Sequence, residues 1–151
     1  MTKKEMIKLL SESINPNKIC GVFLKYDYYY SYYFPLKVNN KFFLGIKEDD
    51  FILNGYSIRR IRDIAKVEIK NDKCLEINIL EGNINNLYVP EINITNWKAI
   101  FTSLKNLGKN IIIEDESLVE DEGQFFIGSI ESVHSNFVYF KHFDADGIWK
   151  E

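Results

Sequence analysis

The sequence has few cysteines, few prolines and no long apolar run. Its two cysteines, Cys20 and Cys74, lie far apart and form no CxxC pair. This spacing favours two reduced thiols in the cytoplasm over a disulfide framework. No stretch approaches the ~20 apolar residues of a membrane-spanning helix, and the charged N-terminal segment MTKKEMIKLL has too short an apolar stretch for a signal peptide. We therefore expect a soluble cytoplasmic protein with no membrane contact.

Patterns that carry enzyme chemistry are also missing. The sequence contains no phosphate-binding glycine loop and no metal-ligand spacing. The two histidines, His134 and His142, form no recognisable catalytic triad. DADG at residues 144–147 begins like a calcium loop, but the remaining ligands do not follow, and a hairpin turn explains it better. We expect a protein that is not an enzyme and that holds no metal and no cofactor.

Charge and composition narrow the class further. The 151 residues are 46% hydrophobic and 15% aromatic, which argues against disorder. The formal net charge is −3, whereas a general nucleic-acid binder is usually basic. The composition therefore indicates a folded protein without a strong electrostatic preference for nucleic acid.

Two amphipathic helices are predicted. Residues 2–5 read T-K-K-E, a capping box, and apolar residues follow at helical spacing. We expect a helix over residues 3–13 that ends before the N-P-N segment. A second helix is expected to begin after Thr95 or Asn96 and to end at Gly108.

Short runs of β-branched and aromatic residues, broken by polar clusters, make up most of the remaining chain. Strands are expected over residues 19–26, 32–38, 42–47, 57–69, 111–113, 125–133 and 137–143. Between them, CLEINIL at residues 74–80 fits a short helix started by Asp72, and its alternation fits a strand nearly as well. The predicted fold class is α+β, mainly β.

The order helix, strands, helix, strands indicates a duplication. The best register sets residues 32–50 beside residues 125–146, each with an apolar strand, a polar turn, an aromatic strand and an acidic turn. The first copy continues into SIRRIRDIAKVEI, which we expect to be one long final strand, and the second copy has no counterpart. We predict two tandem units, residues 1–92 and 93–151; the alternative is one compact domain. The second unit would then have a free sheet edge that invites pairing with another chain.

Two segments share a loose motif. FIGSIESVHSNFVYFKHFDADG has a small residue at Gly128 and apolar residues at Ile130 and Val133, and ICGVFLKYDYYYS has Gly21 and Asp27. This pattern is similar to the first Sm motif, and the helix followed by short strands resembles Sm-like and SH3-like small barrels. The chain also resembles a group of uncharacterised proteins from low-GC Gram-positive bacteria with two such tandem units. The resemblance implies two bent β-sheet units, each preceded by a helix.

The resemblance to Sm proteins also implies an RNA site. In those proteins a base stacks on a residue in the loop after the motif's Asp, near an Asn, and an Arg-Gly pair completes the pocket. The matching positions here are Asp27, Tyr29, Ser31, Arg59 and Arg60. Ser31 stands in place of the Asn and Arg60 in place of the permissive Gly. Although these two positions depart from the pattern, the resemblance makes RNA binding by an Sm-like module the alternative function.

The stretch KYDYYYSYYF, residues 25–34, holds six tyrosines. A hairpin turn is expected there, and turns lie at the surface. Exposed aromatic patches mark interfaces. We therefore predict that Tyr28, Tyr29, Tyr30 and Tyr32 contact a partner. The alternative is that alternate rings of the stretch enter the core.

The chain's only arginines cluster in the segment SIRRIR; they are Arg59, Arg60 and Arg62. Together with Asp27 they are candidates for a contact with nucleic acid or another anion, since guanidinium groups bind phosphate and carboxylate in a bidentate manner. The alternative is a solvated strand with local ion pairs to Asp63 or Glu68.

The acidic run EDESLVEDE at residues 114–122 is expected to be a solvated loop or edge strand, where charge opposes aggregation. The sequence thus predicts a non-enzymatic protein that contacts another protein or a second copy of itself. An adaptor or an immunity-type protein would fit, because an acidic surface can cover a basic partner. The alternative, RNA binding, would weaken steeply with salt.

Overall fold

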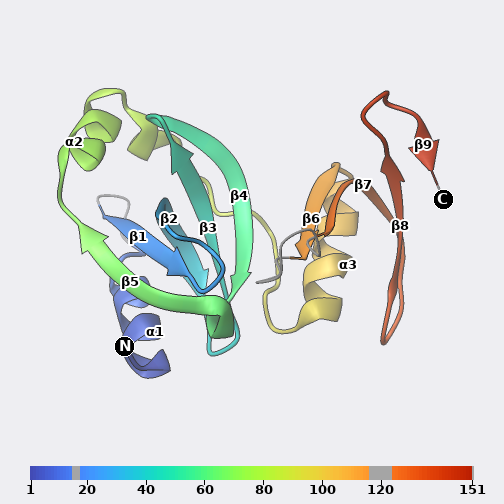
Figure 1. Cartoon of the computed structure of the whole chain (residues 1–151), viewed down its shortest axis with the longest axis horizontal. Coiled ribbons are helices and arrows are strands. Elements are labelled where there is room, and N and C mark those ends of the chain that lie inside the picture. The colour runs from blue at the N-terminus through green and yellow to red at the C-terminus, as the bar shows by residue number, and fades with distance from the viewer. Residues whose placement is uncertain (15–17, 116–123, 151) are drawn as a thin grey trace. The chain divides into compact units, whose positions relative to one another are not determined.

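The computed structural model describes residues 1–14, 18–115 and 124–150 (Figure 1). The chain is α+β and mainly β, as predicted, with two antiparallel sheets in two compact units, Met1–Pro90 and Glu91–Glu151. Within the described ranges, no helix combines the length and the apolar character needed to cross a bilayer.

Over residues 1–14 and 18–90, the first unit contains two α-helices, two 3₁₀ segments and five strands. In chain order these are α1 (Lys3–Glu12), β1 (Ile19–Leu24), β2 (Tyr30–Val38), β3 (Phe42–Asp49), β4 (Ile52–Arg60), η1 (Ile61–Asp63), β5 (Ile64–Lys70), α2 (Lys73–Leu80) and η2 (Asn83–Asn86). The strand order in the sheet is β4-β3-β2-β1-β5, and every neighbouring pair is antiparallel.

Helix α1 forms where the capping box predicts it. The backbone N–H of Thr2 donates to the Glu5 carboxylate at 2.7 Å, and the backbone N–H of Glu5 donates to the Thr2 hydroxyl at 3.3 Å. The helix then turns Met6 and Leu10 toward the sheet, where both are buried. Local hydrogen bonds thus start the helix, and apolar burial holds it against the sheet.

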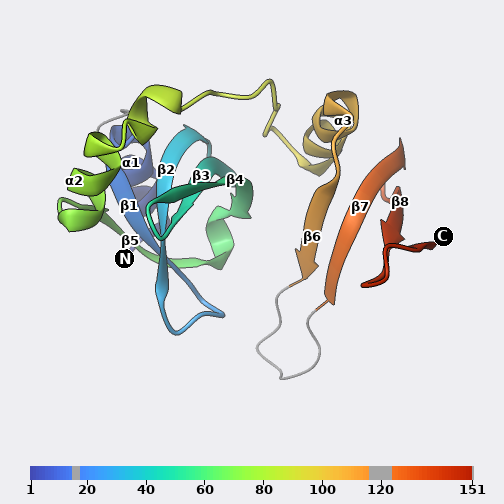
Figure 2. The ribbon, with the colours of Figure 1, turned by 90° about the horizontal axis from the view of Figure 1, so that it is seen from above.

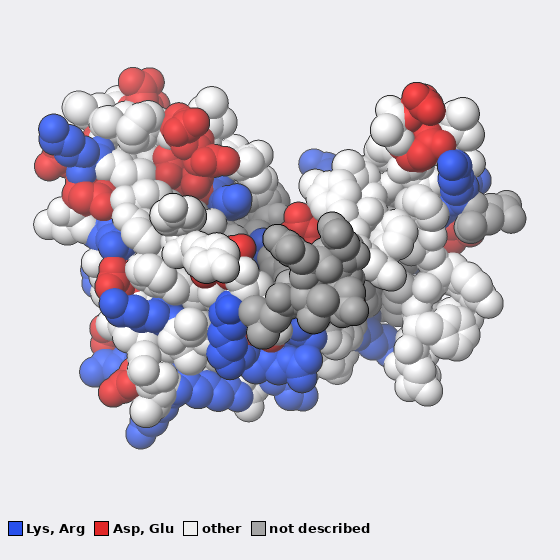
Figure 3. All heavy atoms as spheres, viewed as in Figure 1, with Lys and Arg blue, Asp and Glu red and all other residues white. Residues whose placement is uncertain are grey.

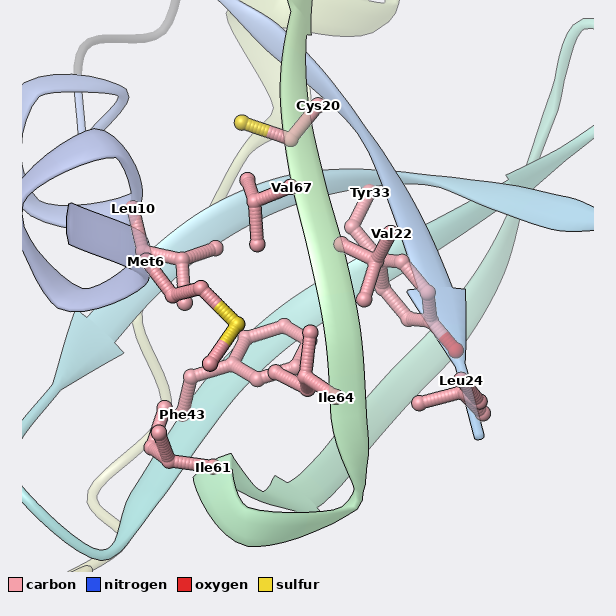
Figure 4. Packing of buried hydrophobic residues seen from close by; sticks show 10 residues of the cluster. All are labelled: Met6, Leu10, Cys20, Val22, Leu24, Tyr33, Phe43, Ile61, Ile64 and Val67. Atoms are coloured by element: carbon pink, nitrogen blue, oxygen red, sulfur yellow. The ribbon is translucent and has the colours of Figure 1, made fainter. Parts of the chain in front are cut away.

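The core of the first unit lies between α1 and one face of the sheet (Figure 4). It contains residues from the helix, from four strands and from η1: Met6, Leu10, Cys20, Val22, Leu24, Tyr33, Phe43, Ile61, Ile64 and Val67. Tyr33 and Phe43 pack edge to face with ring centroids 5.4 Å apart, a favoured aromatic geometry.

Helix α2 covers the opposite face of the same sheet. Ile19 precedes Cys20 on β1, so the two side chains point to opposite faces. Ile19 is buried in a second cluster with Phe34, Cys74 and Leu75. CLEINIL, for which the sequence left helix and strand open, thus belongs to a helix. Asp72 caps this helix, because its carboxylate accepts hydrogen bonds from the backbone N–H groups of Cys74 and Leu75.

The single long strand predicted over residues 57–69 is wrong. The chain instead ends β4 at Arg60, makes the 3₁₀ turn η1, and returns as β5 beside β1. The turn allows Ile61 to enter the core, where it is fully buried. The start of β4 is also earlier than expected, because a tight turn at Asp50 and Phe51, both at positive φ, reverses the chain directly after β3.

In the described residues of the second unit, one helix and four strands occur: α3 (Trp97–Leu107), β6 (Ile111–Asp115), β7 (Gln124–Val133), β8 (Val138–Phe143) and β9 (Trp149–Lys150). Asn96 caps α3 and Gly108 ends it in the left-handed conformation, as predicted. The sheet order is β6-β7-β8-β9. Figures 1 and 2 show α3 close to β6 and β7, with β8 and β9 farther out.

The β2–β3 and β7–β8 hairpins share one geometry. The backbone N–H of Asn39 donates to the Phe42 carbonyl, and that of His134 donates to the Phe137 carbonyl, each at 2.9 Å. In both hairpins the strand register shifts two residues before the last pair of strand residues that closes the loop. The closing pairs are Val38–Phe43 and Val133–Val138. When the two units are aligned on these closing pairs, Tyr32 corresponds to Ile127. The alignment expected from the sequence matched Tyr32 with Phe125, so the two alignments differ by two residues.

Candidate functional site

The turn between β1 and β2 exposes two of the six clustered tyrosines. The side chains of Tyr28 and Tyr29 are 98% and 85% exposed, and Asp27 beside them is exposed as well. These rings are available to a partner. We refer to residues 27–29 as the tyrosine turn.

Tyr30 and Tyr32, which were also predicted to contact a partner, are half-buried on the outer face of the sheet, the face opposite the α1 core. Their rings meet edge to face at 5.2 Å, and the Tyr32 hydroxyl donates to Asp72 at 2.7 Å. Burial, followed by the hydrogen bonds to Tyr30 and Asp72, raises the pKa of Tyr32. Since Asp72 also caps α2, Tyr32 fastens that helix to the sheet.

Space for Tyr30 comes from Gly21 on β1. A Cβ added to Gly21 would lie 3.0 Å from the Tyr30 ring and 2.7 Å from the Lys70 side chain. The Lys70 ammonium sits 4.2 Å from the centre of the Tyr30 ring, within cation–π range, and also donates to Glu68 at 2.6 Å. Hydrogen bonds from Lys66 and Lys70 lower the pKa of Glu68 to about 2. The Lys70 side chain therefore contacts both Tyr30 and Glu68 on this part of the outer face.

The arginine cluster lies at the junction of β4, η1 and β5. Arg60 and Arg62 both pair with Asp63, which also accepts a hydrogen bond from the Tyr26 hydroxyl at 3.3 Å. Arg59 is half-buried on β4. Local pairing to Asp63 was the alternative that the sequence left open. Glu68, the other acid considered there, pairs with lysines instead.

Charge is divided unequally between the units. Residues 1–90 carry 14 Lys and Arg against 11 Asp and Glu, a net charge of +3, whereas residues 91–151 carry 5 against 11, a net charge of −6. In the first unit, Figure 3 shows Lys and Arg gathered at the end where α1 and the β4–β5 turn lie, with Asp and Glu toward α2. Of the predicted acidic run, only Glu114 and Asp115 lie within the described residues, at the end of β6.

A row of apolar residues crosses the whole second sheet. The cross-strand partners are Ile112 with Ile127, Ile127 with Phe143, and Phe143 with Trp149, so the four side chains share one face. Ile112 is 57% exposed and Trp149 is 46% exposed. Phe125, two residues before Ile127 on β7, lies on the same face and is 56% exposed. We call this surface the open face.

Helix α3 covers the other face of that sheet. It packs against β7, where Gly128 and Ile130 are buried while Phe125 is exposed. A Cβ on Gly128 would lie 1.9 Å from the carbonyl oxygen of Lys141, so only glycine lets β8 pass this close to β7. Gly128, which stood out in the sequence as a small residue, therefore has a packing role.

The corresponding row in the first unit is covered. Its cross-strand partners are Gly21 with Tyr32, Tyr32 with Glu48, and Glu48 with Leu53. Glu48 is 4% exposed and accepts hydrogen bonds from the Cys74 thiol at 3.1 Å and the Asn78 amide at 3.3 Å, both on α2. Helix α2 thus covers in the first unit the surface that is open in the second.

The open face was missed from the sequence. A usable signal was present in QFFIGSI, where Phe125, Phe126 and Ile127 place apolar side chains on both faces of one strand. Such a strand is either covered on both sides or exposes an apolar surface. Which of the two holds depends on residues distant in sequence.

Across the described part of the chain, no group of three or more His, Cys, Asp or Glu is placed to hold a metal ion. Burial, and then the Glu48 carboxylate, raises the pKa of the Cys74 thiol to about 12, which keeps it in the unreactive protonated form. Comparisons of the chain with models of protein families, with curated proteins and with solved structures give no match.

Proposed function

We propose that the chain is a non-enzymatic protein–protein interaction module that self-associates through the open face of its second unit. One observation carries the proposal. A row of four apolar side chains crosses all the strands of the second sheet, and its two end members, Ile112 and Trp149, are about half exposed.

The corresponding surface of the first unit is not exposed in this way. There the matching row is covered by α2, and Tyr32 and Glu48 bond to that helix. Exposed patches made of aromatic and aliphatic residues are typical of contact surfaces. An adaptor role follows naturally, because one unit can associate while the other remains available to a further partner.

The proposal includes a fold assignment. Its support is that the first unit has a helix followed by five short antiparallel strands, in the sheet order β4-β3-β2-β1-β5, which agrees with the helix-then-strands pattern of the Sm-like and SH3-like resemblance. The second unit repeats the helix and the first four strands, with the same hairpin geometry. We assign both to that class as a tandem pair in which the second lacks a fifth strand within its described residues.

Light scattering tests the function. The mass of the full chain is measured from low to high concentration at two salt levels, beside an Ile112→Ser, Phe125→Ser variant. We expect the wild-type mass to rise above 17.8 kDa without loss at high salt, and the variant to remain at the monomer mass. A monomer at every concentration, or a variant that associates as the wild type does, would refute the proposal.

RNA binding by the first unit is the second candidate. Its net charge of +3 and the exposed rings of Tyr28 and Tyr29 favour it, since bases stack on aromatic side chains beside a positive surface. Titration of a labelled single-stranded RNA at two salt levels tests it. Binding that falls steeply with salt and is lost in Tyr28→Ser, Tyr29→Ser would support RNA binding over the contact module.

A further inference from the structure

Strand β6 lies at an edge of the second sheet, and it corresponds to β1 of the first sheet, which has neighbours on both sides. Cys20 of β1 pairs with Tyr33, five residues before the closing pair of its hairpin. Ile111 of β6 pairs with Gly128, again five residues before the closing pair. Strand β6 therefore holds the place of β1.

In the first unit the other side of β1 is occupied by β5. Ile64 and Val67 of β5 enter the core, and Cys20 and Val22 of β1 are fully buried. In the second unit, β6 is an edge, and no strand lies on its other side among the residues that the structure describes. Accordingly Ile111 and Ile113 are only half-buried.

The register of β5 on β1 defines what would fit beside β6. Cys20 faces Ile69, Val22 faces Val67, and Phe23 faces Lys66. Transferred to β6, the same register sets Ile69 opposite Ile111, Val67 opposite Ile113, and Lys66 opposite Glu114. An antiparallel strand with alternating apolar and basic residues would thus complete the core and place a cation beside Glu114.

From this correspondence we propose that β6 binds an extended segment of a partner protein, in which apolar residues alternate with Lys or Arg, as an added antiparallel strand in the position that β5 occupies in the first unit. The unit's net charge of −6, with Glu114 and Asp115 ending β6, favours a basic partner over a second acidic copy of the same edge. Main-chain hydrogen bonds provide affinity in this mode, and alternate side chains provide specificity. The inference rests on the proposed function, because it assigns a second contact to the same unit.

The test uses the full chain and a labelled, end-blocked peptide with the β5 sequence, IAKVEIK, by fluorescence polarisation. We expect the peptide to bind, and Glu114→Lys to weaken binding about two- to fivefold, the range of a cross-strand charge pair. A Lys66→Glu peptide should reverse that order and prefer the Glu114→Lys protein.

Two N-methylated peptides test strand addition itself. One carries the methyl groups on Ala65, Val67 and Ile69, the other on Lys66, Glu68 and Lys70. Because alternate N–H groups of an added strand point toward the sheet, one peptide should lose binding and the other should keep it. Equal effects from both, or no binding of the parent peptide, would overturn the inference.

The mass measurement of the proposed function separates the two failures. If the peptide does not bind but the chain still associates through the open face, only the inference is wrong. If the peptide does not bind and the chain is monomeric throughout, both are wrong. A chain whose association is abolished by Glu114→Lys, with no effect from the peptide, would assign β6 to self-pairing and overturn the inference.

Discussion

The stretch KYDYYYSYYF contains both exposed and buried tyrosines, and replacing one kind or the other tests which rings belong to the core. Tyr28 and Tyr29 are almost fully exposed, and no ring contact of theirs is seen in the described structure. Tyr33, four residues later, is 1% exposed and packs against Phe43. The double variant Tyr28→Ser, Tyr29→Ser and the matched single variant Tyr33→Ser therefore remove similar chemistry from opposite environments.

The expected costs differ several-fold. Surface substitutions usually change the free energy of unfolding by about 0.5 kcal/mol or less each, so the double variant should lose about 1 kcal/mol at most. Truncation of a buried large aromatic residue costs about 3–5 kcal/mol, because transfer free energy is lost and a cavity remains. That is a large share of the 5–15 kcal/mol that typically stabilises a domain.

Urea unfolding followed by far-UV circular dichroism measures both free energies. A loss of more than about 2 kcal/mol in the double variant would contradict these expectations, because the two rings would then belong to the core. A cost of less than about 1 kcal/mol for Tyr33→Ser would contradict them as well, since it lies well below the usual range for a buried aromatic residue.

Three further predictions concern packing and titration. Gly128→Ala should lower the stability of the second unit by about 1–3 kcal/mol or more, because the new methyl group meets the Lys141 carbonyl; tryptophan fluorescence during urea unfolding reports this, since both tryptophans lie in that unit. Glu48→Ala should cost about 1–3 kcal/mol for each buried donor left without its acceptor, measured by circular dichroism. Cys20 and Cys74 have raised pKa values, chiefly through burial, so both thiols should stay protonated at pH 8 and resist alkylation until urea unfolds the chain.

The features that the sequence predicted well are governed by neighbouring residues. The capping box at Thr2 and Glu5, the Asn96 cap and the Gly108 stop each depend on hydrogen bonds or backbone geometry within one turn. Such signals act locally whatever the rest of the chain does. The helices α1 and α3 were therefore found within one residue or two of their bounds.

The errors arise where tertiary contacts decide. No glycine or proline marks a turn between Ser57 and Ile69, yet the chain turns from β4 into β5 at η1, where Ile61 is fully buried next to α1. The open face was not predicted for a similar reason, whereas the partner contact predicted for the tyrosine stretch stays a prediction. Exposure of Ile112 and Phe125 depends on which face α3 covers, and a strand's own sequence does not contain that information.

Hydrogen–deuterium exchange at low and high protein concentration tests the central claim most directly, because it locates the contact as well as detecting it. We predict that amides of β7 and β8 become more protected as concentration rises, while those of the tyrosine turn do not change. Greater protection confined to the tyrosine turn, or no concentration dependence anywhere in the chain, would contradict self-association through the open face.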